Sequence, residues 1–101
     1  MHIITQSTLK KFWKIHPEAE VGLRYWYKLT VQHQWQHKED VKNTFPSADP
    51  VGGFTVFNIS GNNYRLITYI DFQNQKVFIR AVLTHAEYDK NNWKKDSWYS
   101  Q

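Results

Sequence analysis

The chain has 101 residues, of which 41% are hydrophobic, thirteen are Lys or Arg, nine are Asp or Glu and none is Cys. This length and apolar content suit one core, and we expect residues 1–101 to form a single domain. The absence of cysteine excludes a disulfide framework, a thiolate zinc site and a thiol nucleophile, and it fits a reducing compartment, so we expect a cytoplasmic protein. No signal-peptide pattern opens the chain and no apolar run approaches the roughly 20 residues of a membrane span, so no membrane partner is expected.

The first third of the chain predicts a strand followed by two helices. Residues 2–5 are typical of a short strand, and Ser7 is placed to cap a helix whose apolar residues recur at helical spacing. Residues 18–31 predict the second helix, because apolar side chains line one face while Glu18 and Glu20 occupy the first turn, where the helix dipole favours acids.

The middle of the chain is the least regular part. Residues 39–45 predict one or two helical turns, after which two prolines and two glycines enforce a loop: Pro46, Pro50, Gly52 and Gly53. No Gly-rich phosphate loop is present, because no lysine follows the glycines.

The second half predicts an antiparallel meander. Turn residues separate three β-rich segments, which cover residues 54–59, 64–72 and 76–84. Residues 91–101 predict either a last helical turn or a loosely ordered tail. The predicted fold class is therefore α+β, with two N-terminal helices packed on a small, largely antiparallel twisted sheet.

Two of the three arginines lie in the middle of predicted strands. Arg65 and Arg80 each interrupt an apolar segment, and burying such a pair is costly without anions. Either carboxylates such as Asp71 neutralise them, or they face an open site that binds phosphate in a two-pronged manner. The sequence leaves both alternatives open.

Strand register decides where these arginines point. Pairing about a turn centred on Asn74 sets Thr68 opposite Arg80 and Tyr64 opposite Thr84, and a shift of one residue would reverse the facing. Strict alternation predicts two faces for the last strand: Val77, Ile79, Ala81 and Leu83 on one, and Phe78, Arg80, Val82 and Thr84 on the other.

A cluster of proton-transfer side chains follows the last predicted strand. His85 stands just past the strand end, beside Glu87, Tyr88 and Asp89. Histidine titrates near neutral pH and suits general acid or base catalysis, although an isolated surface histidine is the alternative. These residues are the best candidates for chemistry in the chain.

Metal sites are not expected. His33 and His37 have the spacing of a two-histidine helical face, but the sequence offers no evident third ligand. His85-Ala86-Glu87 is similar to half of a zinc deaminase motif, and the cysteines that the motif requires are missing. We therefore predict neither a metal nor a cofactor.

Four segments together resemble the HigB family of RelE-like toxins. They are residues 56–62, 64–66, 78–82 and 84–89, and the resemblance extends to the opening strand, the Phe45-Pro46-Ser47 turn and the strand order. It implies a metal-independent ribonuclease toxin that cleaves messenger RNA, usually in the translating ribosome, and that a HigA-type antitoxin holds inactive.

The resemblance also implies roles for particular residues. Such enzymes use the RNA 2′-hydroxyl as nucleophile, and they need a base, cations for the charged phosphorane and an acid for the 5′-oxygen. Four residues of these types are the expected catalytic set: Arg65, Arg80, His85 and Tyr88. Four lysines are expected to bind RNA: Lys76, Lys90, Lys94 and Lys95. Which of His85, Glu87 and Tyr88 is acid or base stays open.

Two other classes of function compete with this one. The net charge of +4 suits a polyanionic partner, so a non-catalytic RNA- or protein-binding module could use the arginines for phosphate alone. A purely structural interaction protein is the third possibility. Cleavage of a translated message separates the enzyme from both.

Overall fold

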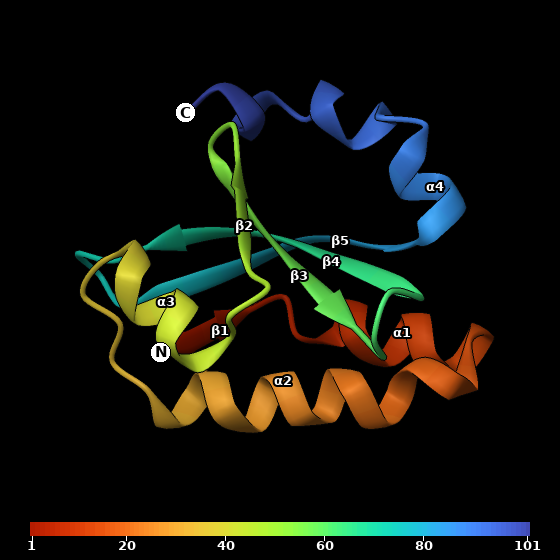
Figure 1. Cartoon of the computed structure of the whole chain (residues 1–101), viewed down its shortest axis with the longest axis horizontal. Coiled ribbons are helices and arrows are strands. Elements are labelled where there is room, and N and C mark those ends of the chain that lie inside the picture. Colours follow the sequence, from red (N-terminus) through yellow and green to blue (C-terminus); the bar gives the residue numbers. More distant parts are fainter.

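The computed structural model describes residues 1–101 and contains a five-stranded sheet, with the two longest helices on one side and the C-terminal helical turns on the other (Figure 1). The strands are β1 (His2–Ile4), β2 (Asp49–Val51), β3 (Phe54–Ile59), β4 (Tyr64–Asp71) and β5 (Lys76–Thr84). The α-helices are α1 (Ser7–Ile15), α2 (Glu20–Gln32), α3 (Lys38–Thr44) and α4 (His85–Asp89). Three short 3₁₀ helices complete the chain: η1 (Pro17–Ala19), η2 (Asn92–Lys95) and η3 (Ser97–Ser100). No helix is both long and apolar enough to span a membrane.

The sheet is mixed but mostly antiparallel. Its strand order is β1-β5-β4-β3-β2, in which β1 runs parallel to β5 and every other neighbouring pair is antiparallel. The meander from β3 to β5 was predicted, and the bounds of β3 and β5 agree with the prediction. The α+β class, with two N-terminal helices on a largely antiparallel sheet, is confirmed.

One side of the sheet, the helix face, carries the main core. α1 and α2 pack there, and the buried side chains include Leu9, Leu23, Trp26, Phe57 and Leu66. The Trp26 ring meets Phe57 of β3 edge to face at 5.4 Å between centroids. Leu23 is completely buried, so truncating such a side chain costs about 2–5 kcal/mol. This layer holds the strands that carry the candidate site.

The opposite side of the sheet, the C-terminal face, is covered by the last residues of the chain. Figure 1 shows this segment on the other side of the sheet from α2. A smaller core of Phe54, Val56, Ile67 and Trp93 lies here, with Trp98 and Tyr99 packed against it. The tail, for which helical and loose conformations were both predicted, therefore forms two 3₁₀ helices that dock on the sheet.

The Gly52-Gly53 pair is explained by this docking. Gly52 has a positive φ of 59°, and a Cβ there would lie 2.6 Å from the Tyr99 ring. A Cβ on Gly53 would lie 2.4 Å from the Gln101 carbonyl oxygen, while its N–H donates to the Tyr99 carbonyl. Only glycine permits so close an approach of the C-terminal residues to the β2–β3 turn.

A β-bulge at Arg80 corrects the predicted register. Tyr64 pairs with Thr84 as expected, but Thr68 pairs with Ile79 instead of Arg80, because the register shifts between Ile67 and Thr68. One extra residue on β5 is left without a partner on β4, which is the definition of a bulge.

The bulge also corrects the predicted faces of β5. Val77, Ile79 and Val82 join the core of the helix face, whereas Ala81 and Leu83 pack with the core of the C-terminal face. Strict alternation was wrong, because a bulge places two consecutive residues on the same side of the strand. Arg80 and Ala81 are the two consecutive residues that share the C-terminal face, and Arg80 meets Asp96 there.

Two local predictions in the first half were wrong. Ser7 is the first residue of α1 rather than its cap; the preceding Gln6 makes no capping hydrogen bond through its side chain. The predicted loop around Pro50 contains the short strand β2, which lies at the edge of the sheet, where a missing N–H is tolerated.

Candidate active site

A cleft of about 440 Å³ opens on the C-terminal face of the sheet. Its lining comes from six parts of the chain: Lys42 of α3, the loop Pro46–Ala48, Asp49 of β2, Val56 and Asn58 of β3, Arg65 of β4 and Tyr88 of α4. Most of the lining is polar, and two cations, a carboxylate, an amide and a phenol reach the same space. Such a set can hold and polarise an anionic substrate.

Arg65 contributes the best placed cation of this cleft. Its Nη1 donates to the carbonyl oxygens of Asn62 at 3.0 Å and Tyr64 at 3.1 Å, which fixes the side chain near the start of β4. No carboxylate lies within salt-bridge distance of it. Its charge is uncompensated and most of its five N–H donors remain available for an anion.

Tyr88 lies beside Arg65 and closes one side of the cleft. The Arg65 guanidinium carbon is 5.4 Å from the centroid of the Tyr88 ring, which is within cation–π range. The Tyr88 ring also stacks on Trp93, with 5.0 Å between the ring centroids. Burial raises the pKa of the Tyr88 phenol, the Asp49 carboxylate raises it further, and Arg65 opposes both. Tyr88 therefore stays protonated at neutral pH and can donate a proton or a hydrogen bond.

The short helix α4 is fixed by a capping box. The Thr84 hydroxyl accepts a hydrogen bond from the Glu87 N–H at 3.2 Å, and the Glu87 carboxylate accepts one from the Thr84 N–H at 2.9 Å. Two N–H groups that would otherwise lack partners are satisfied in this way. Glu87 is thus engaged in starting the helix that carries Tyr88.

His85 occupies the first position of α4, as its place after the strand predicted. Its backbone N–H donates to the Asn63 carbonyl at 3.1 Å, which ties the helix to the β3–β4 turn. The side chain is 53% exposed, and Nδ1 lies 3.0 Å from Asp89. His85 does not line the cleft, but it stands one helical turn before Tyr88, so both side chains lie on the same side of the helix.

Arg80, the other mid-strand arginine, has a carboxylate partner. Its Nε and Nη2 each donate to Asp96 at 2.8 Å, and its guanidinium lies 4.0 Å from the centroid of the Trp98 ring. Arg80 holds the pKa of Asp96 below its ordinary value of 3.8. Asp71, considered from sequence as a counter-ion, instead accepts hydrogen bonds from Asn74 in the β4–β5 turn. Arg80 does not line the cleft.

The four lysines expected to bind RNA separate into two groups. Lys90 follows the last residue of α4, and Lys94 and Lys95 belong to η2, so these three exposed side chains come shortly after Tyr88. Lys76 begins β5 opposite Asp71, at the other end of the strand from Thr84. The fold therefore brings three of the lysines to the α4 end of the sheet and leaves the fourth apart.

Comparison with known proteins gives the same assignment as the motifs. Residues 19–91 match the family described as HigB_toxin, RelE-like toxic component of a toxin-antitoxin system. The chain belongs to this HigB family. It is 35% identical over 92 residues to the mRNA interferase toxin HigB of Escherichia coli strain K12, covering 88% of each chain. It is 30% identical to the mRNA interferase HigB of Escherichia coli O6:H1, covering 89% of this chain and 90% of that one. The family resemblance predicted from the sequence is confirmed.

Several residues of the cleft in this HigB-family chain escaped prediction. Lys42, Ser47 and Asp49 come from the irregular middle segment, where no periodicity indicates which side chains face inward. Asn58 did carry a signal, since it is a polar residue within an apolar strand, as Arg65 is. The two are direct partners across β3 and β4.

The histidines and carboxylates of the chain do not gather into a metal-binding cluster. No three His, Asp or Glu groups come together where they could hold an ion. His33 Nδ1 lies 2.6 Å from the Leu29 carbonyl at the end of α2, and His37 pairs with Glu39 and Asp40 at the start of α3. The i, i+4 histidine pair is thus divided between two helix ends.

Proposed function

We propose that this HigB-family protein is an endoribonuclease that cleaves messenger RNA in the translating ribosome without a catalytic metal, and that a HigA-type antitoxin neutralises it. The observation that carries this proposal is the uncompensated Arg65 guanidinium against Tyr88 in an open, polar cleft. The names of the relatives, mRNA interferases, support the same activity.

The first step of the proposed reaction is attack by the RNA 2′-hydroxyl on the adjacent phosphorus. Arg65 stabilises the negative charge that develops on the non-bridging oxygens, since its unused donors are available for this purpose. Lys42, which also lines the cleft, adds a second cation for the same phosphate or its neighbour. The 2′-oxygen forms a new bond to phosphorus, and the bond to the 5′-oxygen breaks.

Two protons move in this step. His85 takes the proton of the 2′-hydroxyl, and Asp89, 3.0 Å away, stabilises the imidazolium that results. Tyr88 donates a proton to the departing 5′-oxygen, a role for which its raised pKa keeps it protonated. The products are a 2′,3′-cyclic phosphate and a 5′-hydroxyl, because an internal nucleophile permits no other first product.

Arg80 has a positioning role in this proposal. Its two hydrogen bonds to Asp96 and its contact with Trp98 hold the C-terminal segment on the sheet. That segment carries Trp93, on which Tyr88 stacks. Arg80 would therefore act on the reaction through Tyr88 and not through the phosphate.

A non-catalytic RNA-binding module is the second candidate. The observation that favours it is the position of His85, which lies outside the cleft with half of its side chain exposed. In that case Arg65 and the lysines would bind phosphate, and no bond would break.

One experiment separates the two candidates. Messenger RNA is translated in a purified system with and without the protein, and the fragment ends are analysed chemically. Cleavage with cyclic phosphate and 5′-hydroxyl ends supports the enzyme, and fragments with 5′-phosphates would require a water nucleophile and end the proposed mechanism. Retardation of RNA without cleavage supports the binding module. The same assay on naked messenger RNA tests the dependence on the ribosome.

Metal independence needs a separate test, because ribosomes themselves require magnesium. Elemental analysis of the purified protein should find no stoichiometric zinc or manganese. The double substitution His33→Ala/His37→Ala should leave cleavage unchanged, since these side chains serve helix ends. Bound metal, or an inactive but folded double variant, would contradict the proposal.

A further inference from the structure

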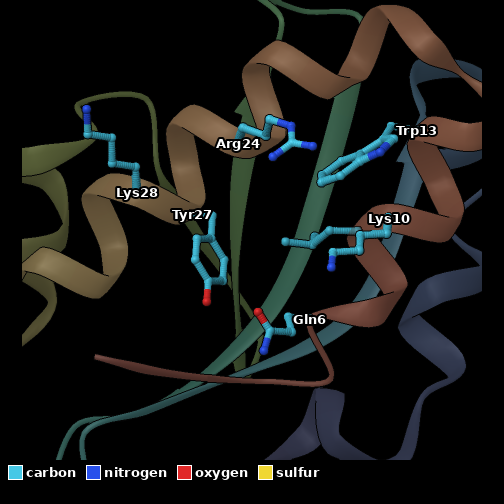
Figure 2. A pocket seen from close by; sticks show the side chains of 7 residues that line it. Gln6, Lys10, Trp13, Arg24, Tyr27 and Lys28 are labelled. Carbon is cyan, nitrogen blue, oxygen red and sulfur yellow. The ribbon is translucent and has the colours of Figure 1, made fainter.

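A second cavity lies on the helix side of the molecule, away from the candidate active site. It is a groove of about 410 Å³ between α1 and α2, lined by Gln6, Leu9, Lys10, Trp13, Arg24, Tyr27 and Lys28. Figure 2 shows Lys10 and Trp13 of α1 facing Tyr27 and Arg24 of α2 across this groove. Its floor is apolar and its rim is cationic. Nothing in the proposed cleavage reaction uses it.

The segment that forms the two walls of this groove is cationic. Residues 7–32 contain five Lys or Arg and two Glu, which is an excess of three out of the total of +4. Only Arg24 among the lining cations has a carboxylate partner, Glu20 at 2.7 Å. Lys10 and Lys28 are exposed and have no such partner, so the rim is suited to an acidic occupant.

The exposed apolar side chains gather on the same helix. The large hydrophobic residues that remain exposed are Ile15, Val21, Tyr25 and Val31, of which three belong to α2. Val21, Arg24, Lys28 and Val31 follow the spacing i, i+3, i+7 and i+10, so they form one stripe along α2 beside the groove. Exposed aliphatic groups at a cation-rimmed groove indicate a protein partner more than RNA, which would be held by phosphate contacts and base stacking.

The length of the groove indicates which kind of partner segment fits it. α2 has 13 residues, which at 1.5 Å per residue gives a stripe of about 20 Å. An amphipathic helix of similar length would set apolar side chains against Leu9, Trp13 and Tyr27 at i, i+3 and i+7, and its acidic flanks would meet Lys10 and Lys28.

We propose that the α1–α2 groove is the docking site for an acidic amphipathic helix of the antitoxin. This inference rests on the proposed antitoxin partner and deepens it by locating the contact. The groove and the Arg65–Tyr88 cleft lie on opposite sides of the sheet, since α1 and α2 belong to the helix face and the cleft opens on the C-terminal face. A helix in the groove therefore does not by itself cover the cleft.

The test measures binding directly, with no need for cleavage. The antitoxin encoded by the neighbouring reading frame is titrated against the protein carrying Arg65→Ala, which makes the toxin producible and leaves the helix side intact. In this background Lys10→Glu/Lys28→Glu should raise Kd on the order of tenfold or more, because the rim would repel an acidic helix. The same background with Val31→Ser should raise Kd at both low and high salt, since it removes an apolar side chain from the interface.

A matched control comes from neighbouring lysines. Lys11→Glu/Lys38→Glu makes the same charge change at exposed residues that do not line the groove, and Kd should stay within about twofold of the parent. Melting temperatures of both double variants should match the parent. The inference is overturned if both double variants weaken antitoxin binding equally, or if Lys10→Glu/Lys28→Glu leaves it unchanged. It is also overturned if Lys10→Glu/Lys28→Glu loses binding only to the ribosome or to RNA. A protein that fails to cleave RNA but passes this test would refute the proposed reaction alone.

Discussion

The two mid-strand arginines, so similar in the sequence, lie in different environments. Arg65 faces an open cleft and makes no ion pair. The guanidinium of Arg80, in contrast, makes two hydrogen bonds to Asp96 and packs on the Trp98 ring. Both side chains are half-buried on the C-terminal face, so neither burial nor the face of the sheet distinguishes them. The difference is the presence of a counter-charge 16 residues further along the chain. An arginine without a partner can serve a substrate, and one with a partner serves the fold.

The largest effect on cleavage is expected from removing His85, the proposed general base near the cleft of Arg65. His85→Gln should lower cleavage by about 10²- to 10⁴-fold, because a general acid or base usually contributes that much. The melting temperature should stay close to that of the wild type, since the side chain is half exposed. The measurement is the single-turnover rate on a translated message. A full rate in the folded variant would show that His85 is incidental and would favour the binding module.

Removing the open arginine should have the next largest effect on cleavage. Arg65→Ala should lower the rate by about 10²- to 10³-fold, because one donor to a developing anion contributes about 2.7–4 kcal/mol. Folding should be little affected, since the side chain donates only to two carbonyls near a turn. Arg24→Ala, on the other side of the sheet, is the control that should retain cleavage. Growth arrest by folded Arg65→Ala at the wild-type rate would make Arg65 structural.

Removing Arg80, which is paired with Asp96, should lower the stability of the fold more than the rate of cleavage. Arg80→Ala should destabilise the fold by about 1.5–3 kcal/mol, the range for hydrogen bonds to charged groups, because Asp96 is left without its partner. Thermal unfolding should move by about 4–8 °C for each kcal/mol. The loss of cleavage per folded molecule should stay well below that of Arg65→Ala. If folded Arg80→Ala and folded Arg65→Ala lost the same amount of cleavage activity, the distinction between a substrate-binding and a structural arginine would be wrong.

Acid titration tests the same ion pair without a deep truncation. The folded pKa of Asp96 is depressed below 3.8 by Arg80, so its contribution to stability is complete above that pH. It is lost as the pH falls through the lower folded value. Asp96→Asn should therefore be less stable than the wild type at neutral pH, and the gap should narrow in acid. Unfolding curves at several pH values measure this, and a gap that stays constant with pH would mean that the pair contributes no linkage.

The smallest effects are expected from substituting the lysines, which should change the salt dependence of RNA binding. Comparing lysines near the two ends of β5 shows which end contacts RNA. Lys94→Ala/Lys95→Ala should lower the salt slope of RNA binding by about one for each phosphate that the variant no longer neutralises. Lys76→Ala, at the other end of the strand beside Asp71, should change the slope less. The measurement is the RNA affinity of each variant across a series of salt concentrations. Equal effects would mean that RNA follows the whole length of the strand.

Much of the fold was predictable because its signals are local. Alternation and turn residues located β3 and β5, and helical spacing located α1 and α2 to within about two residues. The helix cap at Ser7 and the strand β2 were missed, since capping geometry and edge pairing depend on the chain beyond the local pattern.

The candidate site was predictable in part. The motif after β5 located His85 and Tyr88, and the rarity of arginine in strands singled out Arg65. Lys42 and Asp49 were not predictable, because they reach the cleft from α3 and β2, which come near Arg65 through the tertiary structure and not through the local sequence.

The sequence by itself determined the α+β class, the HigB family and the segment that carries the residues proposed for proton transfer. All of these depend on the order and type of neighbouring residues. The tertiary structure alone decided which arginine is open, because the C-terminal segment folds back on the sheet and brings Asp96 to Arg80. Register and counter-charge are long-range properties: a shift of one residue reverses the face of a strand, and a cation is free or paired according to what folding brings beside it.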